Sequence, residues 1–238
     1  MQWGDRRHCA RRYPALITRM PNSAYVQAGA FVILTALALF GGAGTFAIPE
    51  FWLYLAIYAA VMVVSFVTLD PGLLRERMRP GGQRPPLALR LFSVVLFVHW
   101  IIAGLDRGRL HWSDSMPPWL QGIGLFAVAA GYALALWAMY VNRFFSSVIR
   151  IQSDRGQYVI STGPYAFIRH PGYLAGIVIM VASGIGLGSW IATAFLIALS
   201  LPFLLHRAVT EDRVLQAELP GYRDYAQRVR WRVLPGIW

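Results

Sequence analysis

The stretch GPYAFIRHPGYLAG, residues 163–176, places an arginine and a histidine directly before a proline and a long apolar run. Proline is favoured in the first turn of a helix, and it disfavours the helical conformation in the residue before it. We therefore expect Pro171 to begin a helix, with His170 at its N-cap and Arg169 just outside. Gly163 and Pro164 predict a turn that brings Tyr165 back towards the same point.

The apolar run after Pro171 is one of six in the chain. Of the 238 residues, 57% are hydrophobic and only 14% are charged, whereas roughly a quarter are charged in a soluble domain. Runs of about 20 apolar residues predict membrane-spanning helices. They cover Tyr25–Phe46, Phe51–Leu69, Leu87–Leu105, Pro118–Tyr140, Tyr173–Leu187 and Trp190–Leu205. The last two are short and are separated only by GLGS, which predicts a tight hairpin. The expected fold is an all-α, polytopic membrane bundle of about six transmembrane helices that ends in a helical hairpin, followed by a cytoplasmic C-terminal helical segment.

The formal net charge of +11 comes entirely from arginines, and their distribution follows the predicted spans. They cluster in the N-terminal tail, between spans two and three, between spans four and five, and after span six, whereas two of the other connections have none. This alternation predicts that both termini are cytoplasmic, and we expect a bacterial inner (cell) membrane. Basic loops also favour contact with anionic membrane lipids. The charge therefore needs no nucleic-acid partner.

These features predict three parts of the chain: a basic cytoplasmic tail (1–24), four transmembrane helices (25–142), and a cofactor-binding catalytic region that includes the hairpin (143–238). Proline and glycine in DPGLLRERMRPGGQRPP, residues 70–86, predict a solvated loop. The single cysteine, Cys9, cannot form a thiolate cluster, and no metal site is expected. His99 falls inside span three, where an ionisable residue is either functional or satisfied by a neighbouring helix.

Two polar groups stand out at the cytoplasmic ends of the last two spans. His170, Arg169 and two tyrosines, Tyr165 and Tyr173, gather at a helix N-terminus, which favours an anion. Beyond span six, Arg207, Glu211 and Leu215 share one face if the helix continues, and Glu211 and Asp212 form an acidic pair. Tyr222 and Tyr225 fall on one side of a short helix. From spacing alone, a solvated helix with ordinary charge pairs explains this second group better.

The ordered motifs GPYAFIRHPGY (163–173), RAVTED (207–212) and GYRDYAQRVRWRVLP (221–235) resemble the signature of the isoprenylcysteine carboxyl methyltransferase family. The resemblance covers roughly residues 143–238, and the first four spans match only as generic membrane helices. Phospholipid methyltransferases and sterol-reductase-like membrane enzymes share much of this tail.

The resemblance implies an integral-membrane methyltransferase that uses S-adenosylmethionine on a lipid or prenyl-like acceptor, either a carboxylate or an amine. It assigns cofactor binding to Gly163, Pro164, Tyr165, Arg169, His170, Pro171, Tyr173, Glu211, Asp212, Tyr222 and Tyr225. The family usually has two glutamates where this chain has Glu211 and Asp212. An amine acceptor must lose a proton, for which Glu211 or His170 is the candidate base, and Arg207 or Arg230 is expected to orient the acceptor.

Two other functions are compatible with the same sequence. One is a membrane reductase of the sterol-reductase type that uses NADPH, although such enzymes tend to carry a bulkier aromatic turn in place of Gly163–Pro164–Tyr165. The other is a non-enzymatic membrane accessory protein that retains the fold. The expected partners are membrane lipids and a lipophilic or prenylated small molecule. The sequence determines neither the acceptor nor the oligomeric state.

Overall fold

Helices are the regular secondary structure of the described part of the chain, and loops connect them. The computed structural model describes residues 22–82 and 86–238; residues 1–21, with Cys9 and most of the predicted tail, lie outside the described residues. The α-helices are α1 (Asn22–Ala43), α2 (Pro49–Thr68), α3 (Pro71–Met78), α4 (Leu87–Leu105), α5 (Pro118–Val141), α6 (Pro171–Gly186), α7 (Trp190–Glu218) and α8 (Tyr222–Arg228). Short turns form η1 (Pro80–Gly82), η2 (Asp106–Leu110), η3 (Ser153–Arg155) and η4 (Gly163–Ala166). The predicted all-α fold is confirmed, because no strand occurs within these ranges.

Among the described residues, five helical segments are long and apolar enough to cross a membrane: Ala24–Ala43, Pro49–Thr68, Leu87–Leu110, Pro118–Val141 and Trp190–Glu218. The chain is therefore a multi-pass membrane protein. The other predicted span corresponds to α6, which has only 16 residues. At 1.5 Å per residue it is about 24 Å long, less than the roughly 30 Å of a hydrocarbon core. α6 packs between α5 and α7 in the bundle.

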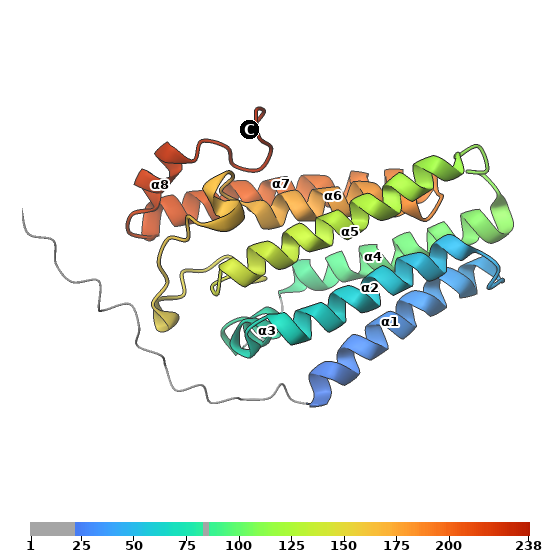
Figure 1. Ribbon diagram of the computed structural model, residues 1–238, viewed down its shortest axis with the longest axis horizontal. Helices are drawn as coiled ribbons and strands as arrows, with labels where there is room; N and C mark the ends of the chain where they lie inside the picture. The colour runs from blue at the N-terminus through green and yellow to red at the C-terminus, as the bar shows by residue number, and fades with distance from the viewer. Residues whose placement is uncertain (1–21, 83–85) are drawn as a thin grey trace, which may run out of the picture.

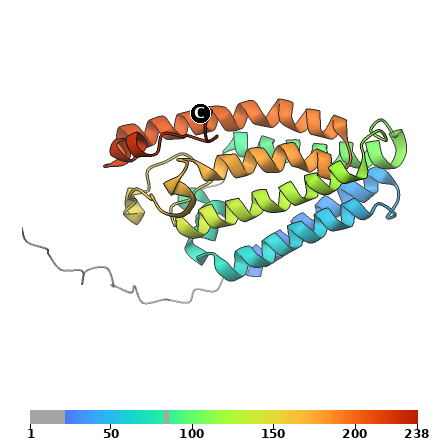
Figure 2. The ribbon, with the colours of Figure 1, turned by 45° about the horizontal axis from the view of Figure 1, so that its top comes forward.

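The long helices lie side by side and alternate in direction (Figure 1). α1 packs against α4, α5 against α6, and α7 against both α4 and α6. The connection that contains α3, the α5–α6 connection and α8 gather at one end of the bundle, on the left of Figure 1, and Figure 2 shows the same grouping from another side. The arginine-rich connections thus share one end, which we call the site end.

The last long helix extends well beyond its predicted membrane span. Span six was expected to end at Leu205, whereas α7 continues to Glu218. The two boundaries differ because the apolar composition ends before the helix does. Arg207 and Glu211 therefore lie on one continuous helix face, as their spacing predicts.

The predicted loop at residues 70–86 is wrong in its first half. Asp70 caps α3 by accepting a hydrogen bond from the Leu73 N–H at 3.0 Å, and Pro71 occupies the first turn. Leu73 is buried, and Glu76 is buried in an ion pair with Arg150 of the α5–α6 connection. Proline and glycine content misled the prediction, because a proline directly after an N-cap residue begins a helix.

Close helix contact depends on particular glycines, and Gly104 is a clear test. A Cβ atom at Gly104 would overlap the Leu39 carbonyl oxygen of α1, so the two backbones would have to separate. We expect Gly104→Ala to lower the melting temperature of the detergent-purified protein. Gly122→Ala is the matched control, since its Cβ atom meets nothing within 4 Å and alanine favours the helix. Equal melting temperatures for the two variants would contradict this account of the α1–α4 contact.

Candidate active site

The GPY turn, which precedes α6, is held by contacts from two segments. Gly163 has a left-handed backbone (φ +57°), and a Cβ atom there would lie 2.9 Å from Val141 Cγ2. The Tyr165 hydroxyl accepts a hydrogen bond from Asn142 Nδ2 at 3.1 Å, and the Tyr165 carbonyl accepts one from the Tyr225 hydroxyl at 2.7 Å. α6 begins at Pro171 with His170 as its N-cap residue. The turn thus joins the end of α5 to α8.

Asp212 is completely buried and is surrounded by donors from the residues just before α6, from α7, from α8 and from the segment after α8. Its Oδ1 lies 3.1 Å from His170 Nε2 and from the Tyr222 hydroxyl, and 3.0 Å from Arg169 Nε; its Oδ2 lies 3.2 Å from Arg169 Nη2, 3.0 Å from Arg232 Nε and 2.7 Å from Gln216 Nε2. We call these six residues the Asp212 cluster. Two arginines beside one buried carboxylate stabilise its charge. The Asp212 side chain thus joins α7 to the start of α6 and to the segment after α8, residues 229–238, which is called the tail from here on.

The tyrosines of the site act as neutral donors and acceptors. Burial, together with the charge of Asp212, raises the pKa of the Tyr222 hydroxyl above its ordinary value. Burial likewise raises the pKa of the Tyr165 hydroxyl. Both hydroxyls therefore stay protonated near neutral pH, and the Tyr222 hydroxyl donates a hydrogen bond to Asp212 Oδ1.

The segment after α8 folds back over the N-terminus of α6. The Arg169 N–H donates to the Trp231 carbonyl and the His170 N–H to the Arg232 carbonyl, both at 2.9 Å. Arg169 Nη1 lies within 3.4 Å of the carbonyl oxygens of Ala226, Val229 and Arg230. The N–H groups and the guanidinium that were expected to hold a ligand carboxylate are thus already bonded to the protein itself.

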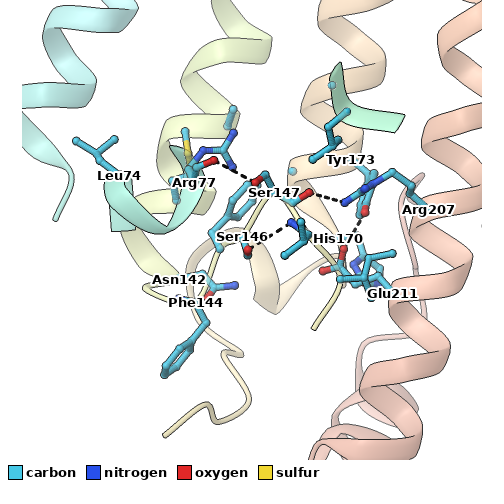
Figure 3. A pocket seen from close by; sticks show the side chains of 18 of the residues that line it. Leu74, Arg77, Asn142, Phe144, Ser146, Ser147, His170, Tyr173, Arg207 and Glu211 are labelled. Carbon is cyan, nitrogen blue, oxygen red and sulfur yellow. Dashed lines mark hydrogen bonds between the residues drawn. The ribbon is translucent and has the colours of Figure 1, made fainter. Parts of the chain in front are cut away.

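A cavity of about 830 Å³ lies beside the Asp212 cluster. At its polar end the Tyr173 hydroxyl donates to Glu211 Oε2 at 2.7 Å, and Arg207 Nη2 donates to the Ser147 carbonyl at 2.8 Å. Figure 3 shows the side chains of Tyr173, Arg207 and Glu211 close together beside Ser147. This end therefore combines one carboxylate, one guanidinium and a phenol.

The other end of the cavity is apolar and reaches into the membrane part of the bundle. Its walls include Phe31 of α1, Met62 of α2, Tyr132 and Met139 of α5, Ile179 of α6 and Phe203 of α7. On α5 the lining extends from Asn142 to Tyr132, which is about 15 Å along a helix and close to half the thickness of a hydrocarbon core. Polar and apolar ends share one cavity.

The expected site residues divide into those that line this cavity and those that support it. Tyr165, Arg169, His170, Tyr173, Arg207, Glu211, Tyr222 and Tyr225 line it. Gly163, Pro164, Pro171 and Asp212 are not among the lining residues, and the last three of them are buried. Arg230 has an exposed side chain away from the lining, so its role in orienting the acceptor stays a prediction and Arg207 is the better placed of the two.

Further lining residues were not among the predicted site residues. Leu74 and Arg77 of α3 line the cavity, as do Phe144, Ser146 and Ser147 after α5. The capping pair Asp70–Pro71 was a signal for α3, but no local pattern places α3 against the α5–α6 connection. His99 is buried in α4 outside this lining, and neither ring nitrogen has a hydrogen-bond partner among the described residues.

Comparison with known proteins gives a family match for the central part of the chain. Residues 123–217 match the model of the isoprenylcysteine carboxyl methyltransferase (ICMT) family. This central region therefore carries the match to the ICMT family. The structure of a eukaryotic intramembrane Ras methyltransferase, ICMT, superposes with a TM-score of 0.63 and 18% identity, over 88% of this chain and 75% of that one. The predicted resemblance is confirmed, and the fold is that of ICMT.

Two bacterial proteins are similar to part of the chain. The cobalt-zinc-cadmium resistance protein CzcN of Cupriavidus metallidurans is 29% identical over 136 residues, 55% of this chain and 57% of its own. The nickel-cobalt-cadmium resistance protein NccN of Alcaligenes xylosoxydans xylosoxydans is 28% identical over 148 residues, 58% of this chain and 60% of its own. The chain thus spans less than two thirds of these relatives.

Within the ICMT match lie the GPY turn, His170, Glu211 and Asp212, whereas Arg77 precedes it and Tyr222 follows it. The structure brings these outlying residues to the same cavity or to the cluster beside it.

Proposed function

We propose that the chain is an integral-membrane methyltransferase that takes a methyl group from S-adenosylmethionine and acts on a lipid or prenyl-like acceptor. The observation that carries the proposal is the single cavity with a polar end at Glu211 and Arg207 and an apolar end inside the bundle. Such a cavity suits a polar cofactor and an amphipathic acceptor that meet at the boundary between the two ends.

The residues at the polar end fit the charges of S-adenosylmethionine. The cofactor supplies a methyl group on a positively charged sulfur, and it also carries an ammonium and a carboxylate. Glu211 is the single acid among the described lining residues, and it would pair with the ammonium. The ring of Tyr173 could lie against the sulfonium as a cation–π partner. A volume of about 830 Å³ is within the range of small-molecule sites.

The protein's contribution to methyl transfer would be alignment and exclusion of water. Arg207 would orient a carboxylate acceptor, which is already ionised near neutral pH and needs no base. For an amine acceptor, Glu211 would take the proton that the nitrogen must lose. His170 is less suited to this role, because its Nε2 lies against Asp212.

We also propose the orientation in the membrane. The site end carries the arginine-rich connections, so the positive-inside rule puts it and both termini in the cytoplasm of a bacterial cell, at the inner membrane. The cofactor would then enter from the cytoplasm, and the acceptor from the lipid.

Calorimetric titration of the detergent-purified protein tests the cofactor. We expect S-adenosylmethionine to bind and NADPH not to bind, because the polar end offers a carboxylate for an ammonium. Binding of NADPH alone would favour the reductase of the sterol-reductase type. In a second assay, native membranes are incubated with methyl-labelled S-adenosylmethionine and the labelled lipid is identified; no labelled product, together with no cofactor binding, would favour a membrane accessory protein.

A further inference from the structure

Arg77 of α3 reaches the cavity from a segment outside the ICMT match. Its guanidinium carbon lies 4.9 Å from the centre of the Phe145 ring, and the residue is partly buried. Figure 3 shows Arg77 and Arg207 on opposite sides of Ser147. The Ser147 hydroxyl donates to the Arg77 carbonyl at 3.0 Å, and the Ser147 carbonyl accepts from Arg207 Nη2 at 2.8 Å. One residue therefore sets the spacing between the two arginines.

Arg77 has no carboxylate partner within the described residues. Its neighbour Glu76 is turned away, with Oε1 lying 3.1 Å from both Arg150 Nη2 and the Ser146 hydroxyl. Burial lowers the pKa of the Arg77 guanidinium below its ordinary value, and Tyr165 acts weakly in the opposite direction. A buried cation is costly unless an anion pairs with it, and the cation–π contact with Phe145 offsets only part of that cost.

The described lining of the cavity carries more cations than anions. Its arginines are Arg77, Arg90, Arg150, Arg169 and Arg207, and its single acid is Glu211. Arg150 and Arg169 have their own carboxylates, Glu76 and Asp212, and Arg90 is exposed. Glu211 accepts a hydrogen bond from Tyr173. Arg77 and Arg207 are left facing the cavity without a carboxylate of the described chain.

We propose that Arg77 and Arg207, spaced by Ser147, form an anion site that holds a carboxylate or phosphate group in the cavity. The planar guanidinium suits both groups, because it offers parallel N–H donors. This inference rests on the proposed function, which supplies two sources of such an anion. One is the carboxylate of S-adenosylmethionine, and the other is the head group of the lipid acceptor.

The anion site itself can be tested without the cofactor. Dodecanoate and dodecanol, which share a chain and differ in charge, are titrated against the protein in a neutral detergent, and thermal stabilisation is measured. We expect the wild type to bind dodecanoate about tenfold more tightly than dodecanol, and Arg77→Met to lose that preference. Arg77→Lys keeps the positive charge but lacks the parallel N–H donors of a guanidinium, so its preference for dodecanoate should be intermediate. Arg79→Met, at an exposed position just after α3, is the matched control and should keep the preference.

Titration with S-adenosylmethionine and with its decarboxylated analogue then identifies the source of the anion. If the site holds the cofactor carboxylate, Arg77→Met weakens S-adenosylmethionine binding about tenfold and leaves the analogue unchanged. If it holds the acceptor head group, both cofactor affinities stay as in the wild type and only the preference for dodecanoate is lost.

An Arg77→Met protein that folds, binds S-adenosylmethionine like the wild type and keeps the full preference for dodecanoate would overturn the anion site while leaving the proposed function intact. Conversely, failure of S-adenosylmethionine to bind the wild type would count against the proposed function, and the dodecanoate comparison would still decide the role of Arg77.

Discussion

Asp212→Ala is expected to release the segment after α8 from the N-terminus of α6. The substitution leaves Arg169, His170 and Arg232 without their shared carboxylate, and the first two of these are buried. Removing one partner of a buried ion pair costs about 3–5 kcal/mol of unfolding free energy, because the other charge stays buried without a partner. Cofactor affinity should fall as well, because Tyr222 and Arg169 line the cavity.

Hydrogen exchange measures this release directly. The backbone N–H groups of Arg169 and His170 donate to carbonyls of the tail, so both should lose protection in Asp212→Ala. Asp154→Asn is the control, since Asp154 also pairs with an arginine but its side chain is 60% exposed. An exposed ion pair contributes little to the stability of the fold, so this variant should show the same hydrogen exchange as the wild type. Retained protection of Arg169 and His170 in Asp212→Ala would show that the cluster does not hold the tail.

Glu211→Gln is expected to weaken S-adenosylmethionine binding by about ten- to a hundredfold while leaving the fold intact. Glutamine has nearly the same shape as glutamate but has no charge for the ammonium. The Tyr173 hydroxyl keeps an acceptor in the amide oxygen, so the wall of the cavity should keep its form. Calorimetry gives the affinity, and the melting temperature reports on folding.

The control for this experiment is Glu218→Gln, which removes a carboxylate from an exposed position on the same helix. It should bind S-adenosylmethionine as tightly as the wild type. If Glu211→Gln binds S-adenosylmethionine as tightly as the wild type, Glu211 does not bind the ammonium as proposed. That result would favour the accessory protein over the methyltransferase. A loss in both variants would point to the overall charge of the helix instead.

Local rules predicted much of the helical frame. The start of α6 at Pro171 follows from the restrictions on proline and its preceding residue, and the short helix that holds Tyr222 and Tyr225 follows from spacing. Apolar run lengths predicted the spans. The same kind of rule failed for α3, because proline and glycine mark both loops and helix starts, and the Asp70 cap decides between them.

Which residues gather at the site end could be predicted, but not which of them face the cavity and which face the Asp212 cluster. Glu211 and Asp212 are adjacent on α7 and project about 100° apart around the helix axis. Glu211 faces the cavity, whereas Asp212 faces Arg169 and the tail. No local pattern chooses between these directions, since the choice depends on how α6 and the tail pack against α7.

The amino-acid sequence by itself determined the membrane bundle, the shared end of its arginine-rich connections and the place where α6 begins, because run length, charge and proline geometry act within a few residues. Only the tertiary structure decided that Asp212 binds Arg169 and holds the segment after α8, and that Glu211 faces the cavity. It also decided that Arg77 of α3 lines the same cavity. These outcomes depend on which charges meet across segments far apart in the chain, where each buried carboxylate or guanidinium takes the partners that packing brings to it.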